Sequence, residues 1–514
     1  MMYTRAQRDD FDSWNTPGWS TDELIPFLRK LETYDGPGDP SLHGTSGPVR
    51  VSSGPFRSVE TEDDFLRAAA ATGCREVKDL QDLDRNDGWQ RWWRYVSPEG
   101  VRSDTAHAYV HPRLRDGKHP NLHVVVEAQV VRVLFEDDGD AKRASAVEYA
   151  PNPKFNPDAT GRERRTVRAR KLVVVSCGAC GTPPVLERSG IGAAPVLERA
   201  GVPLVQDLPG VGYDYQDHHL TLYPFRTSMR PDQTIDDVIL GRVSLEAARE
   251  RKEPRLGWNS IDMAAKLRPT EEETLGLGET FRAAWVKDYK DKPNRPLFIM
   301  AMIQVYIGPP ALADEPIQYI TMGNCTAYPY SRGHLHITGP SPNDPLDFDV
   351  GYFGDPGEVD ITKQVWAYKK MREIVRRMST YRGEVPGCHP QFAADSAAAC
   401  VRLEIGDANP FTTGEKGAVA DIAYTEEDDA AIRQWLRETV QTTWHSLGTA
   451  KMAPRGDLGV VDADLSVHGV RGLKVADMSI APANIGSNTN NTAILIGEKA
   501  ADIIIRELGL GGAK

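Results

Sequence analysis

Short apolar segments separated by polar turns run along the whole chain, and each segment predicts a helix or a strand. Ser20 and Glu23 have the spacing of a capping box, so a helix is expected to begin there. Its apolar positions share one face: Leu24, Phe27, Leu28 and Leu31. Residues 35–48, rich in glycine and proline, then predict a loop, which is either a surface flap or an inert connector.

Two valine-rich segments predict strands of a first domain. Residues 122–134 are dense in valine and are expected to pair with residues 144–149 through the turn at 137–140. Residues 171–175 are almost wholly apolar and are followed by a helical pattern, which predicts a strand buried on both faces and its crossover helix. A turn of this kind can hold a cofactor at the carboxyl end of the strand.

The middle of the chain has a different pattern of charged and apolar residues. Residues 220–440 combine charged helical stretches, such as 270–273, with strand patterns such as 334–337, and predict a second domain of mixed sheet and helices. The segment 472–477 then predicts a strand. A closing helix over 489–508 has its buried face at Ile496, Ala500, Ile503, Ile504 and Leu508. The predicted class is α/β, with ranges 1–219, 220–440 and 441–514.

Composition narrows the possible partners. A chain of 514 residues exceeds what one core usually organises, so two joined domains are expected. The net charge of −12 argues against a nucleic-acid surface. No apolar run is long enough to span a membrane, no signal peptide is visible, and the final Gly512-Ala513-Lys514 is not a peroxisomal Ser-Lys-Leu address. With six irregularly spaced cysteines, this predicts a cytoplasmic protein with reduced thiols.

Two polar residues near the end of the chain suggest chemistry. His445 follows Trp444 in an apolar stretch, and Asn488 lies 43 residues further on, just before the last helix. The imidazole can act as a base for a hydroxyl, and the amide can hold the alkoxide that forms. The alternatives are a histidine of the core and an ordinary Asn helix cap.

Other candidates are weaker. Cys177 and Cys180 have the spacing of a redox motif, but they end a predicted buried strand. His107 and His111 are four residues apart, but Pro112 follows and no acidic ligand has metal-site spacing. No metal site is predicted.

These segments resemble a known family. Residues 178–192 match, position for position, the second signature of the glucose-methanol-choline (GMC) oxidoreductases. Leu208 to Gly212, the Gln216-Asp217-His218 segment, residues 330–333, Trp444 to Thr449 and the Asn488-Thr489 helix start follow in the family's order. Within the family, residues 1–6, 365–370 and 495–499 are most similar to the fungal and yeast alcohol (methanol) oxidases.

The resemblance implies a fold, a cofactor and a reaction. The fold would be a GMC-type FAD-binding domain interleaved with an α+β substrate-binding domain. The chain would oxidise a small primary alcohol to an aldehyde, with FAD taking the hydride and oxygen or another acceptor taking the electrons. A homo-oligomer is possible. His445 would be the base and Asn488 its partner, with Met2 and Trp444 at the substrate pocket. The residues implied at the cofactor are Val130, Ser176, Gly178, Asp477, Asn488 and Thr489.

One departure from the family opens a second interpretation. In the family, a strand, a glycine-rich loop and a helix that hold the ADP half of FAD come before the position of Met1, and no Gly-x-Gly-x-x-Gly occurs in this sequence. The sequence is therefore expected to lack the N-terminal FAD-binding unit and the first signature. The alternative function is a flavin-free, non-catalytic homologue with a binding or scaffold role.

Overall fold

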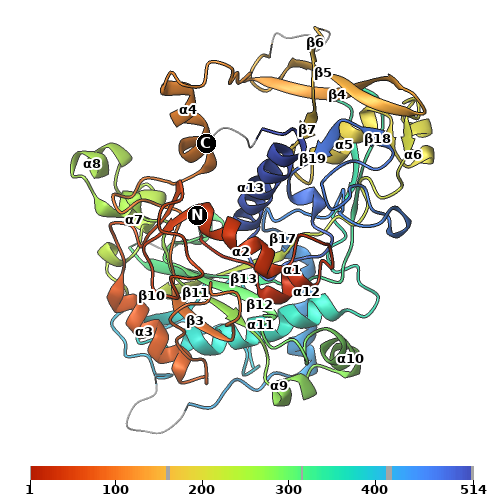
Figure 1. The fold of residues 1–514 in the computed structure, drawn as a ribbon. Helices are drawn as coiled ribbons and strands as arrows, with labels where there is room; N and C mark the ends of the chain where they lie inside the picture. The colour runs from red at the N-terminus through yellow and green to blue at the C-terminus, as the bar shows by residue number, and fades with distance from the viewer. Residues whose placement is uncertain (1, 158–162, 314–315, 413–418, 511–514) are drawn as a thin grey trace.

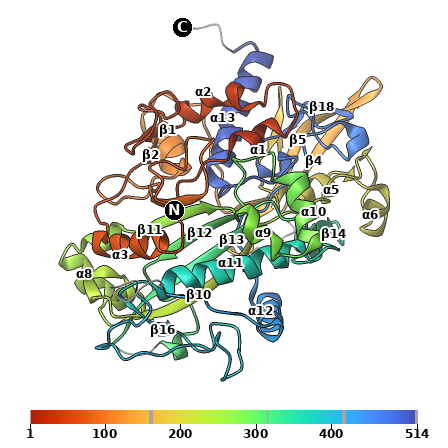
Figure 2. The same cartoon turned by 90° about the horizontal axis from the view of Figure 1, so that it is seen from below.

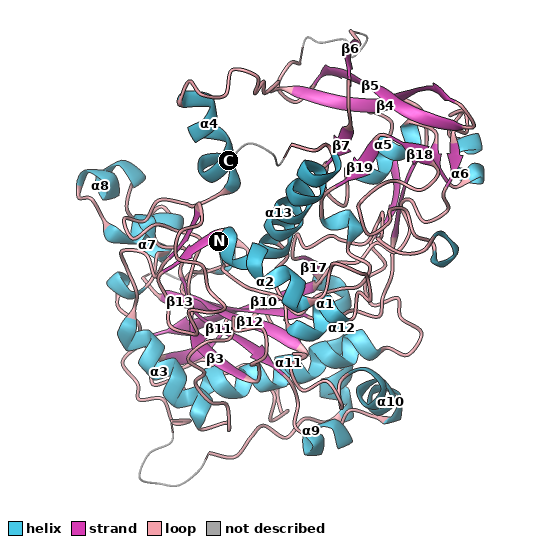
Figure 3. Cartoon of the chain, viewed as in Figure 1, coloured by secondary structure: helices cyan, strands magenta, loops and turns pink. Residues whose placement is uncertain are grey.

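The molecule is built on two sheet-based parts joined by the C-terminal helix and the N-terminal segments (Figures 1 and 3). A computed structural model describes residues 2–157, 163–313, 316–412 and 419–510. In Figure 1 a large sheet lies in the lower part, and a smaller group of sheets lies above it beside the long helix α13 (Asn490–Glu507). This arrangement confirms a mixed α/β fold with several sheets.

The large sheet has seven strands. Its order is β16-β10-β13-β12-β11-β3, with β17 paired to β10, and every pairing is antiparallel. Because β3 and β17 come from outside residues 220–440, the sheet draws on all three predicted ranges. The strands are β3 (Gly88–Arg91), β10 (His219–Thr227), β11 (Ile261–Leu267), β12 (Phe298–Ile303), β13 (Gln318–Thr326), β16 (Tyr381–Glu384) and β17 (Gln441–Thr442).

One long helix covers a face of this sheet. Helix α11 (Val359–Arg376) runs across the strands, as Figure 2 shows, and buries Trp366 against Phe298 and Tyr368 against Tyr223. Burial of apolar side chains of this size supplies most of the stabilisation of such a layer. Further helices of this part are α3 (Val59–Ala70), α7 (Asp236–Ile239), α8 (Leu245–Glu250), α9 (Glu271–Leu275), α10 (Glu279–Asp288) and α12 (Glu426–Thr439).

The upper part contains the turn at which a cofactor was expected. Strands β7 (Val173–Val175) and β19 (Leu473–Val475) pair in parallel, and α5 (Thr182–Arg188) follows β7. Beside them lies a second sheet of β4 (Ala128–Asp138), β5 (Ala141–Pro151), β6 (Arg165–Arg168) and β18 (Val470–Arg471). Smaller elements are β8 (Ile191–Gly192), α6 (Ala194–Arg199), β9 (Gln206–Asp207), β14 (His334–Ile337) and β15 (Leu346–Asp349).

Two strand predictions in this part were partly wrong. The strand expected from residue 122 begins at Ala128, and Val124, Val125 and Val126 before it are exposed because they pair with no strand in the described chain. The strand expected to be buried on both faces has a buried Val173 and Val175, but its Val174 is 41% exposed. One face of β7 is therefore not covered by the described residues.

The predicted terminal helices are confirmed. Helix α2 (Thr21–Lys30) follows Ser20, whose backbone N–H and hydroxyl both donate to the Glu23 carboxylate. Helix α13 packs on α2, with Ile496, Ala500 and Ile503 buried and Ile504 and Leu508 half-buried. The remaining α-helices and strands are α1 (Arg8–Asp12), β1 (Glu32–Tyr34), β2 (Val49–Val51) and α4 (His111–Arg115). Among the described residues, no helix has the length and apolar character needed to cross a bilayer.

Candidate active site

His445 lies where the two parts meet, in the loop after β17. Its side chain is buried, with 7% of the residue exposed. Its backbone N–H donates to Oδ1 of Asp217, at 3.0 Å. Burial, together with the neighbouring imidazole of His218, lowers the pKa of His445 well below 6.5. His445 is therefore neutral at pH 7 and able to accept a proton.

Asp217 organises the loop that carries His445. Its Oδ2 accepts hydrogen bonds from the hydroxyls of Tyr352, at 2.8 Å, and Thr442. The Thr442 oxygen accepts in turn from the backbone N–H of Trp444, at 2.8 Å. Trp444 has a left-handed backbone, with φ at +58°, which costs a non-glycine residue about 1–2 kcal/mol. The Asp217 carboxylate thus holds a strained turn that presents the Trp444 indole, 76% exposed, to a cavity.

Asn488 meets His445 directly. Its Nδ2 lies 3.1 Å from Nε2 of His445, and its Oδ1 accepts a hydrogen bond from the Thr4 hydroxyl at 2.7 Å. Thr4 is buried. The structure therefore brings the two predicted catalytic residues together, and the Thr4 hydroxyl fixes which side of the Asn488 amide faces the imidazole.

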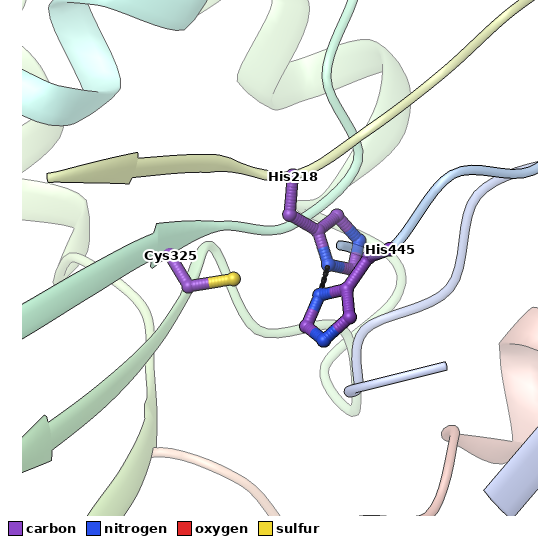
Figure 4. A group of neighbouring side chains, drawn as sticks. All are labelled: His218, Cys325 and His445. Carbon is purple, nitrogen blue, oxygen red and sulfur yellow. Dashed lines mark hydrogen bonds between the residues drawn. The ribbon is translucent and has the colours of Figure 1, made fainter. Parts of the chain in front are cut away.

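Two further side chains surround the imidazole. His218, on the segment that leads into β10, places its Nδ1 2.9 Å from Nδ1 of His445, and Cys325 points at both rings from β13 (Figure 4). The ligand-type atoms of the three residues lie within 4.8 Å of one another. Burial raises the pKa of the Cys325 thiol to about 12, so the thiol is protonated at neutral pH.

A cavity of about 630 Å³ opens beside these residues. Four of the residues expected at a cofactor line it, Ser176, Gly178, Asp477 and Thr489, and so does Trp444. The rest of its lining is mostly apolar or aromatic: Ala179, Tyr215, Phe348, Val350, Tyr352, Met478 and Ala493 among others. Such a wall suits a flat, partly aromatic ligand.

Asp477 links the two chain segments that line one side of this cavity. It follows β19, and its Oδ2 accepts from the Gly178 N–H at 3.0 Å and from the Thr182 hydroxyl at 2.6 Å. Because β7 and β19 are parallel, their carboxyl ends reach the cavity side by side. Gly178 has φ at +78° with open space where a side chain would be, so its backbone is accessible to a ligand.

Two predicted site residues lie elsewhere. Val130 lines a neighbouring cavity of about 430 Å³, together with Cys177, Cys180 and Gly181. Met2 packs against a buried cluster of Val77, Leu80, Trp92, Ala264 and Ala301 and is not among the residues that line the larger cavity. Met2 also forms an isolated backbone bridge with Arg94, and its place at the substrate pocket stays a prediction.

Cys177 and Cys180, which have the spacing of a redox motif, are both free thiols in the structure. Both also line the larger cavity. Burial raises the pKa of each thiol, which disfavours the thiolate that redox chemistry needs.

Sequence reasoning assigned no role to Thr4, Asp217, His218 or Cys325. A signal existed for Asp217 and His218, because they lie in a segment that resembles the family. Thr4 lies in residues 1–6, which also resemble the family, whereas Cys325 carries no local signal, since its contacts are made by residues far away in the chain.

Comparison with family models gives matches over most of the chain. A GMC oxidoreductase N-terminal model matches residues 1–220, and a GMC oxidoreductase C-terminal model matches residues 329–497.

Among curated proteins, an alcohol oxidase of Pichia angusta is 39% identical over 557 aligned residues, covering 100% of this chain and 82% of the relative. An alcohol oxidase of Candida boidinii is 37% identical, again over 100% of this chain and 82% of the relative. Among solved structures, formate oxidase of Aspergillus oryzae is similar with a TM-score of 0.79 and 20% identity, covering 98% of this chain and 82% of that structure's chain.

Proposed function

The chain belongs to the GMC oxidoreductase family, and on this premise we propose that it is an FAD-dependent oxidoreductase that converts an alcohol to an aldehyde. The observation that carries the proposal is the contact between a neutral, buried His445 and the Asn488 amide. Their chain neighbours Trp444, Ser446 and Thr489 line the cavity of about 630 Å³. Alcohol oxidases that are 37–39% identical to the whole chain support the same reaction.

The residues around the cavity fit FAD. Thr489 lines the cavity and is the N-cap of the 18-residue helix α13, whose free N–H groups and positive dipole end favour the negative charge of a reduced flavin. The accessible backbone of Gly178 and the carboxylate of Asp477, which are hydrogen-bonded to each other, would contact the polar chain of the cofactor. When bound, FAD supplies a hydride acceptor that oxygen can reoxidise, with release of hydrogen peroxide.

The proton of the substrate goes to His445. With the alcohol oxygen between His445 and Asn488, Nε2 of His445 accepts the hydroxyl proton as the carbinol C–H bond breaks. The Nδ2 group of Asn488 donates to the same oxygen and stabilises its developing negative charge. Substituting one donor of this kind typically costs about 10²–10³ in rate.

Small primary alcohols are the proposed substrates. The exposed indole of Trp444 forms a bulky wall of the cavity, which favours a short alcohol over a bulky one. Oxygen is the proposed acceptor. Formation of a homo-oligomer, a cytoplasmic location and the domain ranges 1–219, 220–440 and 441–514 stay predictions.

Flavin spectroscopy tests the proposal. The purified protein should carry a flavin whose visible absorbance is bleached by methanol or ethanol without oxygen, and oxygen should restore the colour and yield hydrogen peroxide. His445→Ala should keep the flavin but lose the bleaching. His107→Ala, at an exposed histidine outside the cavity, is the matched control and should bleach like the parent. A colourless, cooperatively melting preparation that binds no added FAD would favour the flavin-free alternative, which no present finding supports.

A further inference from the structure

The imidazole of His218 is fully buried and stands nearly perpendicular to that of His445. The ring planes make an angle of 84°, and the two Nδ1 atoms lie 2.9 Å apart (Figure 4). Two nitrogens at this distance share one hydrogen, so one ring must donate and the other must accept. Which ring donates decides whether Nε2 of His445 carries a lone pair.

Asn484 decides the state of His218. Its Oδ1 accepts the backbone N–H of Ile485 at 2.8 Å, so this atom of the amide is the oxygen. The same oxygen contacts Nε2 of His218, which must therefore carry a hydrogen. Burial lowers the pKa of His218, so the ring is neutral and has only one N–H. Its Nδ1 is left as an acceptor.

The state of His445 follows from that of His218. If Nδ1 of His218 accepts, Nδ1 of His445 must donate, and Nε2 of His445 is left with a lone pair. The opposite side of the site agrees with the same tautomer. The Thr4 hydroxyl donates to Oδ1 of Asn488, so the Asn488 Nδ2 group faces Nε2 of His445 and needs an acceptor there. Every hydrogen bond from Thr4 through Asn488, His445 and His218 to Asn484 thus runs in one direction.

We propose that His218 is a positioning residue that holds His445 in the tautomer with hydrogen on Nδ1, so that Nε2 is the atom that takes the substrate proton. The inference rests on the proposed function of His445 as the base. The proton moves from the alcohol oxygen to Nε2 of His445. The Nδ1–H of the resulting cation keeps its bond to the lone pair of His218, which neither gains nor loses a proton in the step.

Two variants of His218 distinguish its role as a hydrogen-bond acceptor from its role in packing. His218→Asn places an amide oxygen near the position of Nδ1 and keeps the acceptor, whereas His218→Leu fills similar space without one. In a hydrolase triad, loss of the group that fixes the histidine tautomer costs about 10⁴ in rate. His218 is neutral, unlike the carboxylate of the triad, so we expect a smaller loss: His218→Leu should slow flavin reduction by roughly 10²-fold or more. The alcohol concentration that gives half-saturation should stay unchanged. His218→Asn should recover most of that loss. Equal loss in both variants, or a Leu variant close to the parent, would overturn the proposal.

Nitrogen NMR of the parent tests the same statement without turnover. With ¹⁵N-labelled histidine, the His445 ring, identified by comparison with His445→Gln, should show hydrogen on Nδ1, and the His218 ring should show it on Nε2. Hydrogen on Nε2 of His445 would refute the assignment even if the chain oxidises alcohols. Conversely, a parent with the expected tautomers and no bleaching by any alcohol would refute the proposed function and leave the tautomer assignment standing.

Discussion

Replacement of Thr4 by valine removes one hydroxyl from the site and leaves its shape almost unchanged. The hydroxyl donates to Oδ1 of Asn488 at 2.7 Å. In the variant this oxygen loses that donor, and the contact with His445 still holds the amide. We expect the rate of flavin reduction to fall because the amide spends part of its time with its oxygen facing Nε2.

The size of the effect follows from the environment of Asn488. A neutral hydrogen bond contributes about 1 kcal/mol net, and a fully buried acceptor left without a donor costs about 1–3 kcal/mol. Asn488 is only half-buried, so water can replace part of the loss. A loss of about 1–2 kcal/mol corresponds to a rate roughly 5- to 30-fold lower, since about 1.4 kcal/mol is a factor of ten.

The assay is flavin reduction in an anaerobic stopped-flow instrument over a series of alcohol concentrations, which separates the limiting rate from substrate affinity. Thr4→Ser is the control, because it keeps the hydroxyl and loses only a methyl group, and its limiting rate should stay within about threefold of the parent. If Thr4→Val reduces its flavin as fast as the Ser variant, Thr4 does not orient Asn488.

Three other predictions address the rest of the molecule. Asp217→Asn should destabilise the fold by roughly 2 kcal/mol, because an amide replaces a carboxylate oxygen facing several donors; an unchanged midpoint of chemical unfolding would contradict this. The limiting rate of flavin reduction should stay flat as the pH falls through 6.5 and drop only below it, because burial lowers the pKa of His445 and the base must be unprotonated; a midpoint at or above 6.5 in the pH profile would refute this environment. By linkage, the stabilisation from a neutral His445 is complete above 6.5 and is lost as the pH falls towards the lowered pKa. Glu32→Gln should cost about 3–5 kcal/mol of unfolding free energy, because it leaves the fully buried Arg5 without its charge partner, and denaturant titration showing less than 1 kcal/mol would oppose this.

Local signals predicted local structure well. The Ser20 and Glu23 pair predicted α2, and the apolar spacing of Ile496, Ala500 and Ile503 predicted α13, because both depend on neighbours within a few residues. The exposure of Val174 could not be predicted in this way. Whether a valine of a strand is covered depends on elements that pack on it from elsewhere, and periodicity does not show them.

In the candidate site, too, local motifs predicted some features and distant contacts determine the others. His445 and Asn488 were identified as a pair from their motifs, and the structure brings them within 3.1 Å. Met2 packs against the cluster that contains Val77 and Trp92, and its role at the substrate pocket stays a prediction. The partners that orient the pair lie on other segments, and hydrogen-bond direction follows only from coordinates of both partners.

The hydrogen bond between Thr4 and Asn488 also bears on how the molecule folds. It joins residues 484 positions apart, and the His218 contact with His445 spans a further 227. Closing loops of this length is slow and comes after local helices and hairpins have formed. The active site is therefore assembled in the last stage of folding, and the regain of alcohol-dependent flavin bleaching during refolding reports the arrival of the native topology, whereas recovery of helical circular dichroism precedes it.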